Sequence, residues 1–374
     1  MTPSELAFPR FTVESDDPFE RGRALGAATG LRIRGSIEVY AETFAHYTGL
    51  EWPDVRVRAE RFRAPIEAYD REIAREIEGL AAGASVPVED ILAINARSEI
   101  MFGLKVTPPP ECTSFYVGPA ASADGHVLLG QNWDWRTRTA ATTILAEVSQ
   151  GSRPAFVMLA EAGLVGKIGF NAAGVGVVVN VLISDIDRGD PGVPVHVVLR
   201  GILNAPTLED AVAAVLRARR SASANYLIAS ATGHAVDVET GPGGVEHVYI
   251  AHPEKDLLAH SNHFACGIGF GDASVGEWTD SPVRLETMRS RLEGAHGVLT
   301  RAALPQLLSD HTAFPNGVCR HPDPTNHEVE RSSTVASWIV DLTEQTASVC
   351  AGPPCSGTFV PLVPAFASAP VAVR

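Results

Sequence analysis

The chain has 374 residues, of which 45% are hydrophobic and 20% are charged, and its formal net charge is −14 at pH 7. A chain of this length can bury a large core. Its acidic balance, without a cluster of lysines and arginines, argues against nucleic acid as a partner. No apolar run reaches the ~18 residues of a transmembrane helix, and residues 1–17 lack the apolar region of a secretory signal. We expect one domain over residues 1–374 and no membrane partner.

The cysteines bear on the redox environment and on metal binding. An odd number of widely spaced cysteines is a poor disulfide framework, so we expect a reduced, cytoplasmic protein. Cys350 and Cys355 have no second Cys/His pair at zinc spacing, and the histidines form no recognised ligand pattern. We therefore expect no metal and no cofactor. The other cysteines are Cys112, Cys266 and Cys319. The histidines considered as metal ligands are His260, His263, His311, His321 and His327.

Apolar residues recur at helical spacing through the first hundred residues. One helix is predicted over residues 37–47. A second is predicted over residues 62–80, where a single apolar stripe repeats every three or four positions. A third is expected over residues 89–102, after the break at Pro87.

The pattern changes after residues 107–111, because three consecutive prolines there predict an extended segment. Alternation and apolar runs then predict strands over residues 113–118, 126–133, 142–148, 155–159, 168–182, 225–238, 247–250, 257–264 and 335–342. Helices are expected to begin near Thr207 and Ser281, which are capping residues. Helices followed by a strand-rich stretch with inserted helices indicate an α+β fold, in which helices cover sheets.

The first two predicted strands flank a loop that contains Asp124 and Gly125, a hairpin turn signal. If the loop centres near residue 122, Cys112 faces residues around Asn132 on the neighbouring strand. The thiol would then lie within cross-strand reach of Asn132 and Asp134.

Cys112 allows more than one interpretation. A lone cysteine is most often a small buried apolar residue. A nucleophilic thiol needs a base, and because no histidine lies near the thiol in the hairpin, a Cys-His pair would take its histidine from elsewhere. If the bond before Cys112 is cut, the new α-amino group, whose ordinary pKa is about 7.7–8.0, can itself act as the base.

The run Glu-Cys-Thr-Ser-Phe at residues 111–115, followed by Gly-Gln-Asn-Trp-Asp-Trp at 130–135, resembles the self-processing region of a known family. This is the acyl-CoA:6-aminopenicillanate acyltransferase family, also called cysteine peptidase family C45, whose members are N-terminal nucleophile (Ntn) hydrolases. Further stretches resemble the family in the same order. They are Arg21-Gly22-Arg23-Ala24-Leu25-Gly26, Asn95-Ala96-Arg97-Ser98-Glu99, Gly166-Lys167-Ile168-Gly169-Phe170-Asn171, Gly192-Val193-Pro194-Val195-His196, Ser261-Asn262-His263-Phe264 and Cys319-Arg320-His321-Pro322-Asp323.

The resemblance implies the four-layer αββα sandwich of Ntn hydrolases. It also implies self-cleavage between Glu111 and Cys112 into an α chain (residues 1–111) and a β chain (residues 112–374), which would form a heterodimer. Cys112 would then be the N-terminal nucleophile and would form an acyl thioester. Glu111 departs from the pattern, because glycine precedes the nucleophile in the family's fungal acyltransferase.

The resemblance also assigns roles to other residues. Asp134 would orient the α-amine of Cys112, and Asn262 would donate its side-chain amide to the oxyanion. Arg331 lies near the position of the family's active-site arginine. Trp133, Trp135 and Ser333 are expected in the substrate pocket, and the loop over residues 311–330 is a candidate rim for it.

The function expected from these features is that of an autoprocessed cysteine amidohydrolase or acyltransferase. Its substrate would be a small amide, a peptide-like conjugate or an acyl-CoA-type thioester, and the sequence does not decide between hydrolysis and acyl transfer. Two alternatives remain. Because Glu111 replaces glycine, one alternative is an unprocessed, non-catalytic binding homologue. The other is a Cys-His enzyme that is active as an intact chain.

Overall fold

The structure is a computed structural model that describes residues 7–106 and 112–368. Helices dominate the part before Cys112, and further helices are inserted between the later strands. The helices are α1 (Pro18–Thr48), α2 (Trp52–Glu60), α3 (Arg63–Tyr69), α4 (Arg71–Ala84), α5 (Val88–Asn95), α6 (Arg97–Gly103), α7 (Val195–Leu203), α8 (Leu208–Leu216), α9 (Asp280–Gly294), α10 (Leu304–Leu308) and α11 (Ala365–Ser368), with 3-10 turns η1 (Thr137–Thr142), η2 (Val245–His247) and η3 (Glu328–Glu330).

The strands form two sheets. The eight-stranded sheet has the order β1 (Arg10–Glu14), β4 (Thr143–Gln150), β5 (Arg153–Glu161), β6 (Ile168–Asn171), β7 (Val175–Val181), β8 (Ala224–Ser230), β9 (Ala235–Thr240) and β10 (Val248–Ala251). The six-stranded sheet has the order β11 (Leu257–His260), β2 (Thr113–Val117), β3 (Leu128–Arg136), β12 (Ser332–Asp341), β13 (Thr346–Ala351) and β14 (Val360–Leu362).

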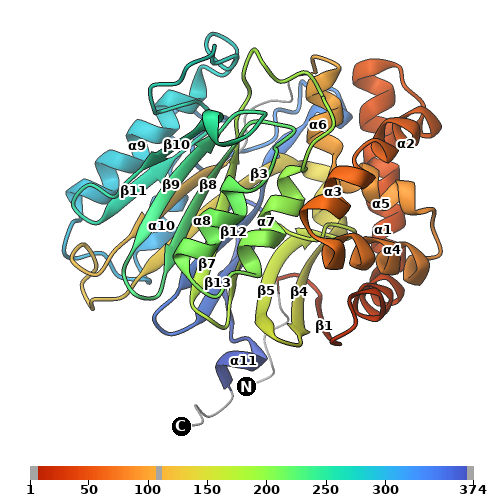
Figure 1. Ribbon diagram of the computed structural model, residues 1–374. Helices are drawn as coiled ribbons and strands as arrows, with labels where there is room; N and C mark the ends of the chain where they lie inside the picture. Colours follow the sequence, from red (N-terminus) through yellow and green to blue (C-terminus); the bar gives the residue numbers. More distant parts are fainter. Residues whose placement is uncertain (1–6, 107–111, 369–374) are drawn as a thin grey trace.

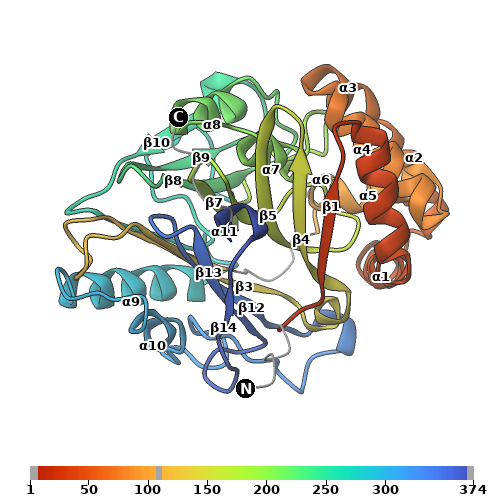
Figure 2. The ribbon, with the colours of Figure 1, turned by 90° about the horizontal axis from the view of Figure 1, so that it is seen from below.

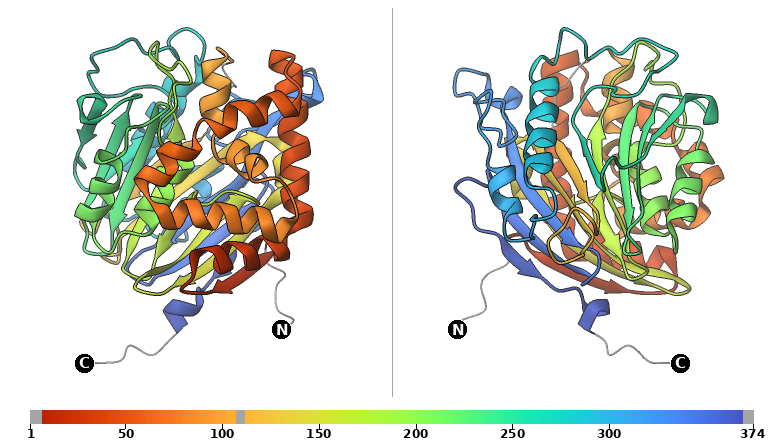
Figure 3. Two further views of the ribbon diagram at one scale, coloured as in Figure 1. Left: turned by 45° about the vertical axis from the view of Figure 1, so that its right-hand side comes forward. Right: turned by 90° about the vertical axis from the view of Figure 1, so that its left-hand side faces the viewer.

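The two sheets pack face to face between two layers of helices (Figures 1 and 2). Strands β2 and β3 contact β7 across the interface, and Trp338 of β12 packs against Phe170 of β6 with ring centroids 6.2 Å apart. Helices α1, α7 and α8 cover the eight-stranded sheet, whereas α9 covers β2 and β11 of the other sheet (Figure 3). This arrangement confirms the predicted α+β fold and its αββα order of layers.

Glycines allow α1 and α4 to approach closely. A Cβ atom on Gly22 of α1 would lie 2.1 Å from the main-chain oxygen of Glu76, and one on Gly79 of α4 would lie 2.1 Å from that of Phe19. Any larger side chain at these positions would push the helices apart. The glycines of the Arg21–Gly26 stretch are therefore explained by packing.

Two buried arginines converge on Glu76 at this helix contact. Arg21 Nε lies 2.8 Å from Glu76 Oε2, and Arg200 Nη1 of α7 lies 2.7 Å from Glu76 Oε1. Burial alone would raise the pKa of Glu76, but the two guanidinium groups hold it below its ordinary value. Because Glu76 precedes Cys112 and Arg200 follows it, this ion pair joins the two segments that the predicted cleavage would separate.

The helix predicted over residues 62–80 is interrupted. At Asp70 the backbone is extended, and the Asp70 side chain caps α4 by accepting hydrogen bonds from the main-chain N–H groups of Glu72 and Ile73. The apolar stripe is nevertheless largely buried as expected, because α3 and α4 both present it to the core. The capping preference of aspartate explains the break.

Three other long predicted elements are also divided, and one of them is the strand expected over residues 225–238, which forms β8 and β9. The helix expected over residues 89–102 is split at Ala96 into α5 and α6. The strand expected over residues 168–182 is split into β6 and β7 by a turn at Gly174, whose φ of 83° suits glycine. Thr207 caps α8 as predicted, with its side chain accepting from the N–H of Asp210. In the described ranges, no helix has both the length and the apolar character needed to cross a membrane.

Candidate functional site

The hairpin predicted around Cys112 is present, but its register differs from the prediction by one residue. Thr113 of β2, and not Cys112, pairs with Asn132 of β3. The expectation that Cys112 faces residues around Asn132 therefore holds only to within one position. A shift of one residue exchanges the two faces of a strand, so Trp133 and Trp135 share the face that meets the Cys112 cavity, whereas Asn132 and Asp134 lie on the opposite face.

Cys112 is buried at the start of β2, with only 3% of its surface exposed. Its φ is 122°, which is uncommon for a residue other than glycine and costs about 1–3 kcal/mol. Such a conformation persists only where surrounding contacts hold it. Glu111, and with it the predicted cleavage bond, lies outside the described residues.

Two side chains hold the main-chain carbonyl of Cys112. Arg284 of α9 donates to this oxygen from Nη1 over 2.6 Å, and Asn180 of β7 donates from Nδ2 over 3.2 Å. The same Nη1 atom donates to the hydroxyl of Thr113 over 3.1 Å, and the hydroxyl of Ser114 donates to Asn180 Oδ1 over 2.6 Å. The start of β2 is therefore fixed between the outer helix α9 and the opposite sheet.

Asn262 belongs to the same group of contacts. Its Oδ1 accepts from Arg284 Nη2 over 2.9 Å, and its Nδ2 donates to the main-chain oxygen of Val181 over 2.9 Å. Arg284 thus bridges Cys112 and Asn262, two of the residues selected from the sequence. Arg284 and Asn180 were not selected.

Asp134 is connected to Cys112 through charged side chains. Its Oδ1 accepts from the hydroxyl of Thr334 over 2.6 Å, and its Oδ2 lies 3.9 Å from Arg320 Nε. Asp280 then accepts from both Arg320 Nη2 over 2.7 Å and Arg284 Nε over 2.9 Å. Burial raises the pKa of Asp134 to about 6, and the two arginines limit that rise.

A narrow cavity of about 20 Å³ opens beside Cys112, with room for about one water molecule. Trp133 and Trp135 line it, together with Cys112. Residues from both sides of the predicted cleavage line it as well, since Ser98 and Phe102 precede Cys112. Widening of this cavity would therefore involve both segments.

Three basic residues from the stretches that resemble the family also line the cavity. They are Arg97, Lys167 and His196. Lys167 Nζ lies 4.7 Å from the ring centroid of Trp133. Arg97 Nη2 forms a buried ion pair with Glu161 over 2.8 Å, and the Arg97 guanidinium contacts the Nε2 atom of His196. Burial, together with the positive charges of Arg97 and Lys167, holds the pKa of His196 well below its ordinary value.

The structure does not place Arg331 among the residues around Cys112 and its cavity. Its guanidinium donates to the main-chain oxygens of Asn326 and Pro324, in exposed contacts. Ser333 pairs with Trp135 across β12 and β3 and lies 3.2 Å from the hydroxyl of Thr137, but it is not among the residues that line the cavity. Their predicted roles draw no support from these contacts.

The loop over residues 311–330 borders a different cavity, of about 350 Å³. Asp280 and Arg320 line it together with residues of the loop. The loop thus reaches the charged groups that surround Asp134, on the opposite side of β3 from the two tryptophans.

Glu99 supplies a pH-dependent contribution to stability close to the cavity. Burial raises its pKa from an ordinary 4.5 to about 7, although its Oε1 accepts a hydrogen bond from the N–H of Val195. As pH rises from 4.5 to 7, the unfolded chain loses this proton first, so the free energy of unfolding falls by about 3 kcal/mol in total. Glu99→Gln is expected to remove this part of the pH dependence.

Urea unfolding at pH 5 and pH 8 tests this prediction. The Glu99→Gln chain should lose less stability between the two values than the wild type, whereas the exposed control Glu38→Gln should behave like the wild type. Equal losses in all three proteins would contradict a raised pKa at Glu99.

A family model described as "Acyl-coenzyme A:6-aminopenicillanic acid acyl-transferase" matches residues 121–355. The chain belongs to this acyl-transferase family. The match covers more than half of the chain and includes Asp134, Asn180, Asn262 and Arg284. It confirms the family that the sequence motifs indicated.

A curated relative of the acyl-transferase family extends the similarity over nearly the whole chain. The acyl-coenzyme A:6-aminopenicillanic-acid-acyltransferase 40 kDa form of Emericella nidulans is 28% identical over 353 residues, which cover 94% of this chain and 91% of that protein.

Solved structures are more distant. A variant of conjugated bile acid hydrolase from Clostridium perfringens matches with a TM-score of 0.45 and 15% identity, over 64% of this chain and 89% of that chain. Penicillin V acylase from Agrobacterium tumefaciens matches with a TM-score of 0.38 and 13% identity, over 64% of this chain and 82% of that chain.

Proposed function

We propose that this chain is a self-processing acyl-transferring enzyme whose nucleophile is the thiol of Cys112. The observation that carries the proposal is the environment of Cys112. Arg284 and Asn180 hold its main-chain carbonyl, while the residue itself lines a cavity between the two sheets. These contacts fix the start of β2, so the Cys112 side chain is held at the cavity as a nucleophile requires.

The processing step is an acyl shift followed by hydrolysis. The sulfur of Cys112 attacks the carbonyl carbon of Glu111, the peptide C–N bond breaks, and the nitrogen of Cys112 takes up the thiol proton. Water then hydrolyses the thioester, which leaves a carboxyl group on Glu111 and frees both the thiol and the α-amine of Cys112. The positive φ of Cys112 supports this step, because cleavage releases the strain stored there.

In turnover, the α-amine of Cys112 takes the proton of the thiol as sulfur attacks a substrate carbonyl, and then passes it to the leaving group. Asn262, whose Oδ1 accepts from the same Arg284 that holds the Cys112 carbonyl, would donate its side-chain amide to the oxyanion. Asp134 positions the amine through the Arg320, Asp280 and Arg284 side chains.

The substrate class follows from the cavity and from the family. An acyl group would enter only once the cavity widens. Its wall of Trp133, Trp135 and Phe102 is apolar, and Lys167 over Trp133 supplies a positive charge for an anionic group. The Emericella nidulans relative is named for an acyl-CoA donor and a 6-aminopenicillanic acid acceptor. We infer a small amide or acyl thioester as the substrate; water or an amine then resolves the acyl-enzyme.

The intact mass of the purified protein under denaturing conditions tests processing. The wild type should give two species, residues 1–111 and residues 112–374, and Cys112→Ala should give one species of 374 residues. Cys266→Ala is the matched control, because Cys266 contacts Glu239 away from the cavity, and it should be cleaved like the wild type. A single uncut species in the wild type would refute self-processing.

A Cys-His enzyme that works as an intact chain is the second candidate, because His196 lines the same cavity as Cys112. Under this mechanism the uncut wild type would hydrolyse amides, and His196→Gln would abolish that activity. Under the self-processing mechanism, His196→Gln should still be cleaved at Cys112. An uncut chain that turns over no amide or acyl thioester would instead indicate a binding homologue.

A further inference from the structure

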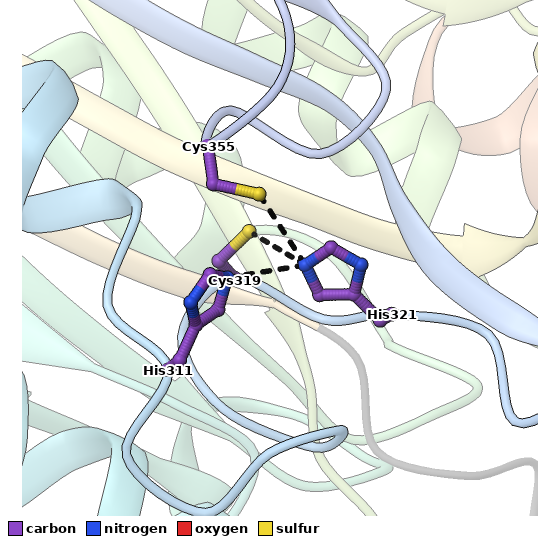
Figure 4. A group of neighbouring side chains, drawn as sticks. All are labelled: His311, Cys319, His321 and Cys355. Atoms are coloured by element: carbon purple, nitrogen blue, oxygen red, sulfur yellow. Dashed lines mark hydrogen bonds between the residues drawn. The ribbon is translucent and has the colours of Figure 1, made fainter.

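Four side chains from two distant segments form a compact group (Figure 4), and none of them lines the Cys112 cavity. Three of them lie in the long loop between α10 and β12, and the fourth lies in the turn between β13 and β14. Each offers one nitrogen or sulfur atom, and these four atoms all lie within 4.8 Å of one another. The residues are His311, Cys319, His321 and Cys355.

The three distances from His321 Nε2 to its neighbours are close to the edges of a metal-centred tetrahedron. His321 Nε2 lies 3.5 Å from Cys319 Sγ and 3.4 Å from Cys355 Sγ. It also lies 3.1 Å from His311 Nε2. With Zn–S near 2.3 Å and Zn–N near 2.0–2.1 Å, tetrahedral geometry places neighbouring nitrogen and sulfur ligands about 3.5 Å apart, and two nitrogens about 3.3 Å apart.

Hydrogen bonding accounts poorly for this convergence. The Nε2 atom of His321 carries either one hydrogen or one lone pair, so it forms one strong hydrogen bond at a time. Three polar neighbours at 3.1 to 3.5 Å exceed that capacity. A cation at the centre would satisfy all four atoms together.

We propose that these four residues bind one zinc ion in a closed, structural site. Two thiolates and two imidazoles in tetrahedral array are typical of zinc. A two-iron cluster with the same residue types would place the sulfurs and the nitrogens on separate irons, and therefore farther apart than in this group. Binding releases the two thiol protons to solvent, and the exposure of His311 and Cys355 gives the ion access.

The site has a consequence for the residues around Asp134. Arg320 lies between the ligands Cys319 and His321, and its main-chain N–H and C=O groups both bond Thr334, which in turn donates to Asp134. The ion would link the loop to the turn after β13. It would thereby hold Arg320 in the position from which it donates to Asp280. Arg320 would be a positioning residue that depends on the metal.

Metal analysis tests the proposal on full-length protein purified without chelators. The wild type should carry about one zinc per chain, and Cys355→Ser and His321→Gln should each lower the zinc content at least about tenfold. His327→Gln is the matched control in the same loop, because His327 stacks on His46 outside the group, and it should keep its zinc.

Two further measurements use the wild-type protein and need no variant. Titration of wild-type thiols with a mercurial reagent should release zinc in step with modification of Cys319 and Cys355. Cobalt(II) added after removal of zinc should give the intense visible absorption of a tetrahedral thiolate complex. A wild-type chain without zinc and without that cobalt spectrum would overturn the proposal, as would a disulfide between Cys319 and Cys355 in freshly purified protein.

Discussion

Replacing Cys112 with alanine is expected to lower turnover of an aryl amide or an acyl-CoA by about 10⁴-fold or more, because the variant lacks the group that forms the covalent intermediate. Release of the aryl amine or of free CoA thiol measures this loss. The effect should exceed that of any other single substitution, because without attack by sulfur no oxyanion forms on the substrate carbonyl for the remaining donors to stabilise.

Loss of turnover in Cys112→Ala has two causes under the proposed mechanism, absence of the nucleophile and absence of cleavage. A trapping experiment on the wild type separates them. A slowly resolved acyl donor should add the acyl mass to the fragment of residues 112–374, and peptide mapping should place it on Cys112. Cys266→Ala should keep both turnover and adduct. Full activity in Cys112→Ala, or an adduct on another cysteine, would contradict the proposal.

The part of the fold that depends on local pattern was predictable from the sequence. The hairpin of β2 and β3 followed from alternation and from the Asp124-Gly125 turn signal, and the capping of α8 followed from Thr207. The register of the hairpin did not follow, because the loop between Val117 and Leu128 is long and its centre is set by packing. An error of one residue there exchanged the faces of Asn132 and Trp133.

The candidate site was predictable only for residues that lie in recognisable sequence motifs. Cys112 stands out as a cysteine after a proline-rich segment, but Arg284 lies 172 positions away and Asn180 lies 68 positions away along the chain. Both reach Cys112 because the layers stack α9 and β7 on opposite sides of β2. The charged Asp280 beside Arg284 was a weak signal, since such pairs are common on exposed helices.

The group of His311, Cys319, His321 and Cys355 was also not predictable from spacing along the sequence. Sequence spacing paired Cys355 with Cys350, five residues away, and this pairing yielded no zinc pattern. The structure places Cys355 beside Cys319 and His321 instead, because the turn after β13 meets the loop before β12. Cys350 is buried, and its sulfur contacts the main-chain oxygen of Ala351 over 3.7 Å. Metal ligands that are far apart in sequence can be recognised only in the folded structure.

Arg284→Met is expected to slow self-cleavage by about 10²-fold, because it removes a charged donor that holds the main-chain carbonyl of Cys112 and so positions the thiol for its attack on Glu111. It also leaves Asp280 with Arg320 as its remaining partner among the described contacts. Breaking a buried charged contact costs about 3–5 kcal/mol of stability, so the conservative variant Arg284→Lys is needed beside it. Lysine keeps the charge, but its single ammonium group cannot reach all four acceptors of Arg284, which lie on four different residues.

The measurement is the fraction of 374-residue precursor in freshly purified protein and its decay with time. Arg284→Lys should fold, as judged by near-UV circular dichroism, and yet cleave more slowly than the wild type. Arg289→Met, on the exposed face of the same helix, should cleave at the wild-type rate. If folded Arg284→Lys and Arg284→Met proteins are cleaved as fast as the wild type, the hold on the Cys112 carbonyl has no part in processing, and Asn180 becomes the donor to test.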